Sequence, residues 1–117
     1  MAFELFVRSR GGAPTVKFAI KGYAKFNSGC LKQYMEPFGY ANVYYDAENK
    51  LIGFQLLKEK SDNAILISKS PSSGTMSLIY FIREYDLEYL QELSLPVEWS
   101  DEHGMLIVKI PEKEVEK

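Results

Sequence analysis

Hydrophobic and polar residues alternate along several short stretches of the chain, and each such stretch predicts a β-strand. In residues 15–20, Val16 and Phe18 fall on one face and Lys17 on the other, as expected of a half-buried strand. The same reasoning predicts further strands at residues 3–7, 23–26, 40–45, 51–57, 64–70, 97–99 and 105–110.

Two short helices are predicted where apolar residues recur at intervals of three and four. Asn27 or Ser28 can cap the first helix, which should stop before the next proline. Thr75 or Ser77 can cap the second. Residues 84–96 either extend the second helix or form a connector, and the pattern leaves both open.

The chain contains two stretches with similar hairpin patterns. "VYYDAENKLIGF" at residues 43–54 is matched 54 positions later by "VEWSDEHGMLIV" at residues 97–108. Strand, polar loop, capped helix, connector, strand, tight turn and strand recur in the same order, which favours an internal repeat. Chance similarity is the alternative, because the identity between the copies is low.

The predicted fold class is therefore mainly β with two short helices, an α+β arrangement. Two β-α-β-β units, at residues 15–58 and 63–111, would form an intrachain pseudo-dimer, since each alone leaves an apolar face and open sheet edges. We expect one compact domain over residues 1–117, ending in a charged tail at 112–117. Whether the units form one barrel or two packed sheets is left open.

The amino-acid composition argues against several classes of protein. The 117 residues are 46% hydrophobic and 26% charged, which is typical of a folded domain, and we expect neither a membrane span nor a signal peptide. Cys30 is the one cysteine and His103 the one histidine, too few for a disulfide framework or a structural zinc site. We therefore expect a cytoplasmic protein without metal or cofactor.

Enzymatic activity is not expected. Cys30 and His103 could serve as nucleophile and base only if they met, and a short apolar helix and a hairpin turn give each a structural role. Adjacent acids such as Asp101 and Glu102 fit a solvated surface better than a pair of catalytic carboxylates. "SPSSGTMS" lacks the lysine and spacing of a P-loop.

Charge is unevenly distributed along the chain, although its sum is only −2. Residues 1–32 contain Glu4 as their one acid, against the six basic residues Arg8, Arg10, Lys17, Lys21, Lys25 and Lys32. That segment carries +5 and the rest of the chain −7, which points to an anionic partner at one end. The alternative is ordinary variation of surface charge along a short chain.

Residues 21–57, "KGYAKFNSGCLKQYMEPFGYANVYYDAENKLIGFQLL", resemble the AbrB/SpoVT swapped-hairpin family, with Gly22 at the bend and "YDAENKLIG" at the acidic hairpin turn. Residues 63–111 follow the pattern more loosely. The arrangement of two units in one chain resembles that of tandem, MraZ-like members. The resemblance implies a swapped-hairpin barrel, usually dimeric, that regulates transcription by binding DNA. By position it implies DNA contacts from Lys17, Lys21, Lys25 and, less directly, Lys32; the second unit offers only Lys69.

Two functions are thus predicted. The first is a non-enzymatic DNA-binding protein, a monomeric pseudo-dimer or a homodimer, whose basic strand face contacts phosphates; Arg8 and Arg10 could reach phosphates from a loop before it. The second is a protein-interaction module that uses the acidic C-terminal half, with Glu84, Asp86 and Glu88. Tyrosines near the lysines could stack on bases, although sheet packing alone favours tyrosine at such positions.

Overall fold

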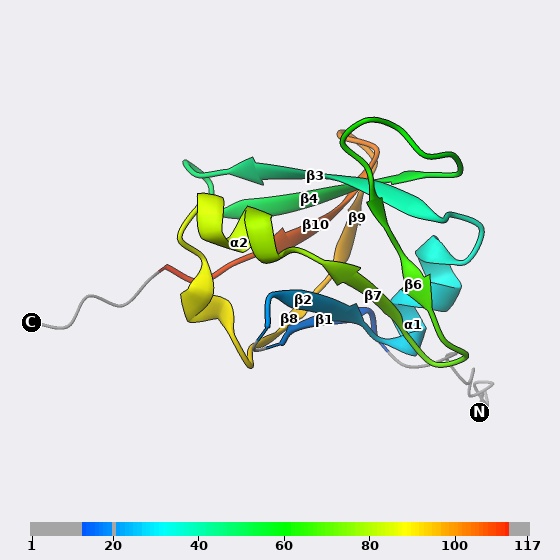
Figure 1. Cartoon of the computed structure of the whole chain (residues 1–117), viewed down its shortest axis with the longest axis horizontal. Helices are drawn as coiled ribbons and strands as arrows, with labels where there is room; N and C mark the ends of the chain where they lie inside the picture. Colours follow the sequence, from blue (N-terminus) through cyan, green and yellow to red (C-terminus); the bar gives the residue numbers. More distant parts are fainter. Residues whose placement is uncertain (1–12, 20, 113–117) are drawn as a thin grey trace, which may run out of the picture.

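The computed structural model describes residues 13–19 and 21–112, which fold into two five-stranded antiparallel sheets with short helices at opposite ends (Figure 1). Sheet A has the order β6-β7-β2-β1-β8 and sheet B the order β5-β3-β4-β10-β9. The strands of sheet A are β1 (Thr15–Phe18), β2 (Tyr23–Phe26), β6 (Ser68–Lys69), β7 (Gly74–Ser77) and β8 (Ser94–Pro96). Those of sheet B are β3 (Tyr40–Asp46), β4 (Leu51–Leu57), β5 (Ile65–Leu66), β9 (Glu98–Ser100) and β10 (Met105–Lys109).

Alternation along the strands separates an inner from an outer face in each sheet. In sheet A, Val16, Phe18, Ala24, Phe26 and Met76 are buried, whereas the residues between them are exposed or partly exposed. In sheet B the inner face includes Ile52, Phe54, Leu106 and Val108. The period-two pattern of the sequence therefore fixes which side of each strand meets the core.

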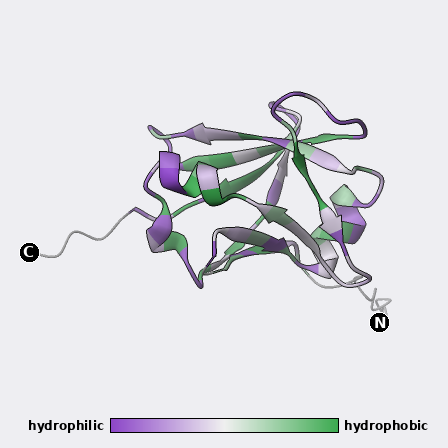
Figure 2. Cartoon of the chain, viewed as in Figure 1, coloured by the Kyte–Doolittle hydropathy of each residue, from purple (hydrophilic) through white to green (hydrophobic). Residues whose placement is uncertain are grey.

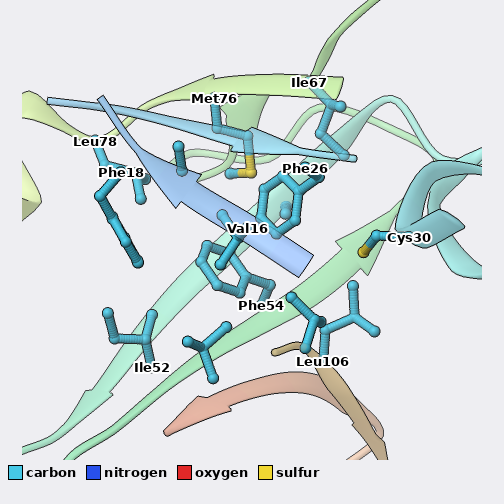
Figure 3. Packing of buried hydrophobic residues seen from close by; sticks show 14 of the residues in the cluster. Val16, Phe18, Phe26, Cys30, Ile52, Phe54, Ile67, Met76, Leu78 and Leu106 are labelled. Carbon is cyan, nitrogen blue, oxygen red and sulfur yellow. The ribbon is translucent and has the colours of Figure 1, made fainter. Parts of the chain in front are cut away.

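The core lies between the inner faces of the two sheets (Figure 3). Phe26 of sheet A and Phe54 of sheet B meet edge to face, with ring centroids 5.1 Å apart, and neither ring is accessible to solvent. Buried side chains from both halves of the sequence form this single cluster. Neither half could bury these side chains alone.

The first helix begins at the predicted cap. The Asn27 side chain accepts a hydrogen bond from the Cys30 N–H, 2.9 Å away, and starts α1 (Ser28–Cys30). A π-helical turn, η1 (Leu31–Met35), continues it and stops before Pro37. The Asn27 carboxamide also accepts from the Thr15 N–H, so the cap ties the helix to β1.

The second helix differs from the prediction. Thr75 and Ser77 lie in β7 and cap nothing; α2 (Ile79–Glu84) begins after Leu78, which makes no side-chain capping bond. β7 pairs with β2 along its whole length, and this pairing outweighs the local capping preference of its hydroxyls. The connector is not a longer helix, because it holds a 3₁₀ turn, η2 (Glu88–Leu90), and then β8.

The strand predicted at residues 64–70 is also divided in the structure. β5 pairs with β3 in sheet B, and β6 pairs with β7 in sheet A. Ile67, between them, is buried. The chain therefore changes sheet at this residue, which a continuous apolar run does not reveal.

The predicted fold class, mainly β with two short helices, is confirmed. The strand pairings of the described residues give two separate sheets and no closed barrel. The strand predicted at residues 3–7 and the tail from 113 lie outside the described residues. Figure 2 shows long hydrophobic stretches in β4 and β10 and a hydrophilic loop after β4.

Candidate nucleic-acid interface

The outer face of sheet A brings together two of the predicted lysines. Lys17 on β1 and Lys25 on β2 are direct cross-strand partners, and both are exposed. Thr75 follows Lys25 on β7, and Ser94 follows Lys17 on β8, so small hydroxyl side chains flank the pair. We call Lys17, Lys21, Tyr23 and Lys25 the lysine face.

Lys21 lies in the turn between β1 and β2, where it lines a groove together with Tyr23. Gly22, in this turn, has a φ of +84°, which favours glycine. This groove, of about 560 Å³, opens beside the turn and is lined by Lys21, Tyr23, Arg83 and Glu88, among others. Arg83 of α2 is therefore a basic neighbour that is 62 positions away from Lys21 in the sequence and was not predicted.

Glu92 partly balances the charge of Lys17. The Lys17 ammonium lies 3.5 Å from Glu92 Oε2, and both side chains are about half exposed. Glu92 is fixed from its backbone, whose N–H donates to the Phe18 carbonyl. Because an exposed ion pair contributes only about 0–1 kcal/mol, this contact leaves Lys17 able to turn to a stronger anion.

The other predicted basic residues are not part of the lysine face. Lys32 is exposed in η1, which follows β2 at the end opposite Lys21. The Lys69 ammonium donates to the Glu36 carbonyl at 2.6 Å, which gives it a structural role. Arg8 and Arg10 lie outside the described residues.

The tyrosines divide between packing and exposure. Tyr34 stacks on Trp99 with centroids 6.1 Å apart, and Tyr45 packs against Phe81 and Tyr85. Tyr23 is 44% exposed and lies on the same face of β2 as Lys25. It is thus the tyrosine placed to combine an aromatic surface with the lysines.

Cys30 and His103 are not arranged as a nucleophile and a base. Cys30 is fully buried, and its Sγ lies 3.6 Å from Met35 Sδ, whereas His103 is exposed in the turn before β10. Burial raises the pKa of the Cys30 thiol to about 12. At neutral pH this thiol is protonated and unreactive.

Within residues 13–19 and 21–112, no group of three or more His, Cys, Asp or Glu side chains could hold a metal ion. The same residues contain no helix long and apolar enough to cross a membrane.

Comparison of the chain with protein-family models, curated proteins and solved structures finds no match. The resemblance to the AbrB/SpoVT family therefore stays a prediction that rests on short sequence motifs. A function for this chain has to be inferred from its own residues and their arrangement.

Proposed function

We propose that this chain is a non-enzymatic, DNA-binding protein of the transcription-regulator kind, which holds a phosphate backbone against the outer face of sheet A. Lys17, Lys21 and Lys25 would neutralise phosphates, and the hydroxyls of Thr75 and Ser77 would donate hydrogen bonds to phosphate oxygens. Arg83 would extend the basic surface along the groove beside Lys21.

The direct pairing of Lys17 with Lys25 is the observation that carries this proposal. Like charges directly opposite each other across two strands are destabilising, so such a pair is unfavourable without an anion nearby. Glu92 lies near only one of the two ammonium groups in the described part of the chain. A phosphate lying across both strands would relieve the repulsion.

The strand pairing supports the pseudo-dimer that belongs to this proposal. β2 pairs with β7, and β4 pairs with β10, both antiparallel. In each pair the partners hold equivalent places in the two predicted units, as a twofold relation between the units would require. The second unit lacks basic residues equivalent to Lys17 and Lys25, so we expect contact with DNA from one side only.

Binding to labelled double- and single-stranded DNA, measured by fluorescence anisotropy over a salt series, tests the proposal. Replacing Lys17, Lys21 and Lys25 together by Gln should weaken binding to all sequences and reduce the slope of log affinity against log salt by roughly 2 to 3. The matched control replaces Lys50, Lys58 and Lys60 by Gln, which changes net charge equally at the other sheet. Equal losses in both triple variants, or no binding at low salt, would contradict a specific lysine face.

The preference between the two DNA forms identifies the mode of contact. Duplex preference indicates that phosphates dominate, whereas single-strand preference indicates stacking on Tyr23. Replacing Tyr23 by Leu should then lower single-strand affinity by about 1 kcal/mol or more and leave duplex affinity nearly unchanged.

A protein-interaction module is the second candidate, favoured by α2 and the turn after it. Tyr80 is 80% exposed on α2, and Glu84 at the end of this helix and Asp86 and Glu88 after it are also exposed. An exposed aromatic ring with acids in the same segment suits a basic peptide. Binding to such a peptide that disappears when the three acids become Gln, together with no DNA binding, would favour this candidate.

A further inference from the structure

The outer faces of the two sheets differ in chemistry. Sheet A presents lysines and small hydroxyl residues to solvent. Sheet B presents large apolar side chains, interrupted by Asn42 and Gln55, which are hydrogen-bonded to each other, and bordered by the charged Asp46, Glu98 and Lys109. We call this second surface the apolar face; it is formed by Tyr44, Leu51, Leu57, Leu66, Met105 and Ile107.

Exposure shows that the apolar face is open. Leu66 is 57% exposed and Tyr44 47%, and the other four side chains are half-buried by their neighbours in the sheet. At its centre, Gly53 lies between Tyr44 and Ile107 on the neighbouring strands. The Met105 and Ile107 side chains cover this glycine, since an added Cβ would lie 3.0 Å from Met105 Cε, and a hollow of about 110 Å³ is lined partly by Tyr44, Gly53 and Met105.

The size of sheet B determines how strongly its outer face can mediate association. The five strands of sheet B contain 24 residues, with seven each in β3 and β4, five in β10, three in β9 and two in β5. At about 3.4 Å per residue and 4.8 Å between strands, this face covers roughly 390 Å², below the roughly 600 Å² per partner at the lower end of specific interfaces, so we expect a weak, concentration-dependent association.

The charges at one end of this face suit a second copy of the same chain. Asp46, Leu51 and Lys109 are neighbours in one row across β3, β4 and β10. A twofold axis parallel to β4 exchanges the places of β3 and β10. It would set Asp46 of each copy opposite Lys109 of the other, on both sides of a contact between the two Leu51 side chains.

The same axis gives a complementary centre. Tyr44 of each copy would lie opposite Ile107 of the other, and the two Gly53 residues would face each other across the axis, each covered by the Met105 side chain of its own copy. Hydrogen bonds from Asn49 lower the pKa of Asp46, so this carboxylate is ionised at neutral pH.

Association of copies through the edges of sheet B is disfavoured, because the edge strands β5 and β9 have only two and three residues.

We therefore propose that the apolar face of sheet B is a homodimer interface, in which two copies pack sheet to sheet about a twofold axis parallel to β4. This proposal does not depend on DNA binding, because the lysine face belongs to the other sheet. Packed sheets of this kind lie about 10 Å apart with their side chains interdigitated.

Sedimentation velocity of the full chain, from low micromolar to several hundred micromolar, is the direct test. We expect a monomer–dimer equilibrium in the wild type. Replacing Tyr44 by Lys should raise the dimer dissociation constant about tenfold or more, since it places charge in the centre of the interface. The matched control is Tyr23→Lys on sheet A, where a tyrosine of nearly equal exposure lies outside the interface.

A charge variant adds an independent measurement. Lys109→Glu should weaken the dimer because it faces Asp46 of the second copy, whereas Lys25→Glu on sheet A should not. Circular dichroism melts confirm that each variant folds before its assembly is compared. A wild type that stays monomeric over the whole range, or equal effects of the variants on both sheets, would overturn the proposal.

Discussion

At the scale of single residues, neighbouring charges and burial change the properties of a few charged or ionisable groups. Lys17 and Lys25 repel each other across two strands, and Glu92 offsets only one of them. Cys30 lies in the core and is kept neutral by burial. Each of these two situations gives a measurable consequence.

Removing the acid beside Lys17 should strengthen DNA binding. Glu92→Gln keeps the shape of the side chain and the backbone bond to Phe18, but it frees Lys17 for phosphate. We expect affinity to rise roughly two- to fivefold at low salt, corresponding to the small free energy of an exposed ion pair. Anisotropy titrations should show the gain shrinking as salt increases; Glu98→Gln, on sheet B, is the matched control. A loss of affinity would mean that Lys17 does not contact DNA.

The Cys30 thiol should make stability depend on alkaline pH. Its pKa rises from an ordinary 9.0 to about 12 in the folded state, so the unfolded chain ionises first and stability falls as pH increases from 9 to 12. At about pH 10.5 this loss is on the order of 2 kcal/mol. Urea unfolding at pH 8 and 10.5 should show a smaller loss in Cys30→Ala than in the wild type. Equal losses would show that the thiol ionises as readily when folded as when unfolded.

At the scale of elements, alternation along the chain was enough to predict most strands, and β4 begins and ends at the predicted residues. Asn27 capped the first helix as expected, because the signal is local. Thr75 and Ser77 carried the same local signal, but pairing with β2 made them part of a strand. β8 was missed for a similar reason, since its place is set by β1, far away in the sequence.

A position can require glycine because its φ is positive or because a neighbouring residue leaves no space for a Cβ. Three glycines of this chain differ in these two respects. A Cβ on Gly22 would lie 2.8 Å from Ile79 Cα at a φ of +84°, whereas Gly104 has a φ of +64° with open space, and Gly39 has open space without a positive φ. We therefore expect Ala to cost more than about 2 kcal/mol at Gly22, about 1 kcal/mol at Gly104 and little at Gly39. Thermal unfolding of the three variants gives the order. Equal losses of stability at Gly22 and Gly104 would show that the close contact between the β1–β2 turn and α2 does not add to the cost of a Cβ at Gly22.

At the scale of the whole molecule, two sheets enclose one core and turn chemically different faces to solvent. The candidate site could be predicted only in part. Lys17, Lys21 and Lys25 were found because they are close in sequence, whereas Arg83 and Glu92 join them through the fold alone. The apolar face is likewise assembled from β3, β4, β5 and β10, and no single stretch of sequence shows it.

The measurement that tests the central proposal most directly is a nuclear magnetic resonance titration of the isotope-labelled chain with a short DNA duplex at low salt. Binding by the lysine face predicts chemical-shift changes at the amides of β1, β2 and β7, centred on Lys17, Lys25 and Thr75, with the outer face of sheet B unaffected. Changes centred on sheet B or on the acidic turn after α2, or none at all, would contradict DNA binding by the outer face of sheet A.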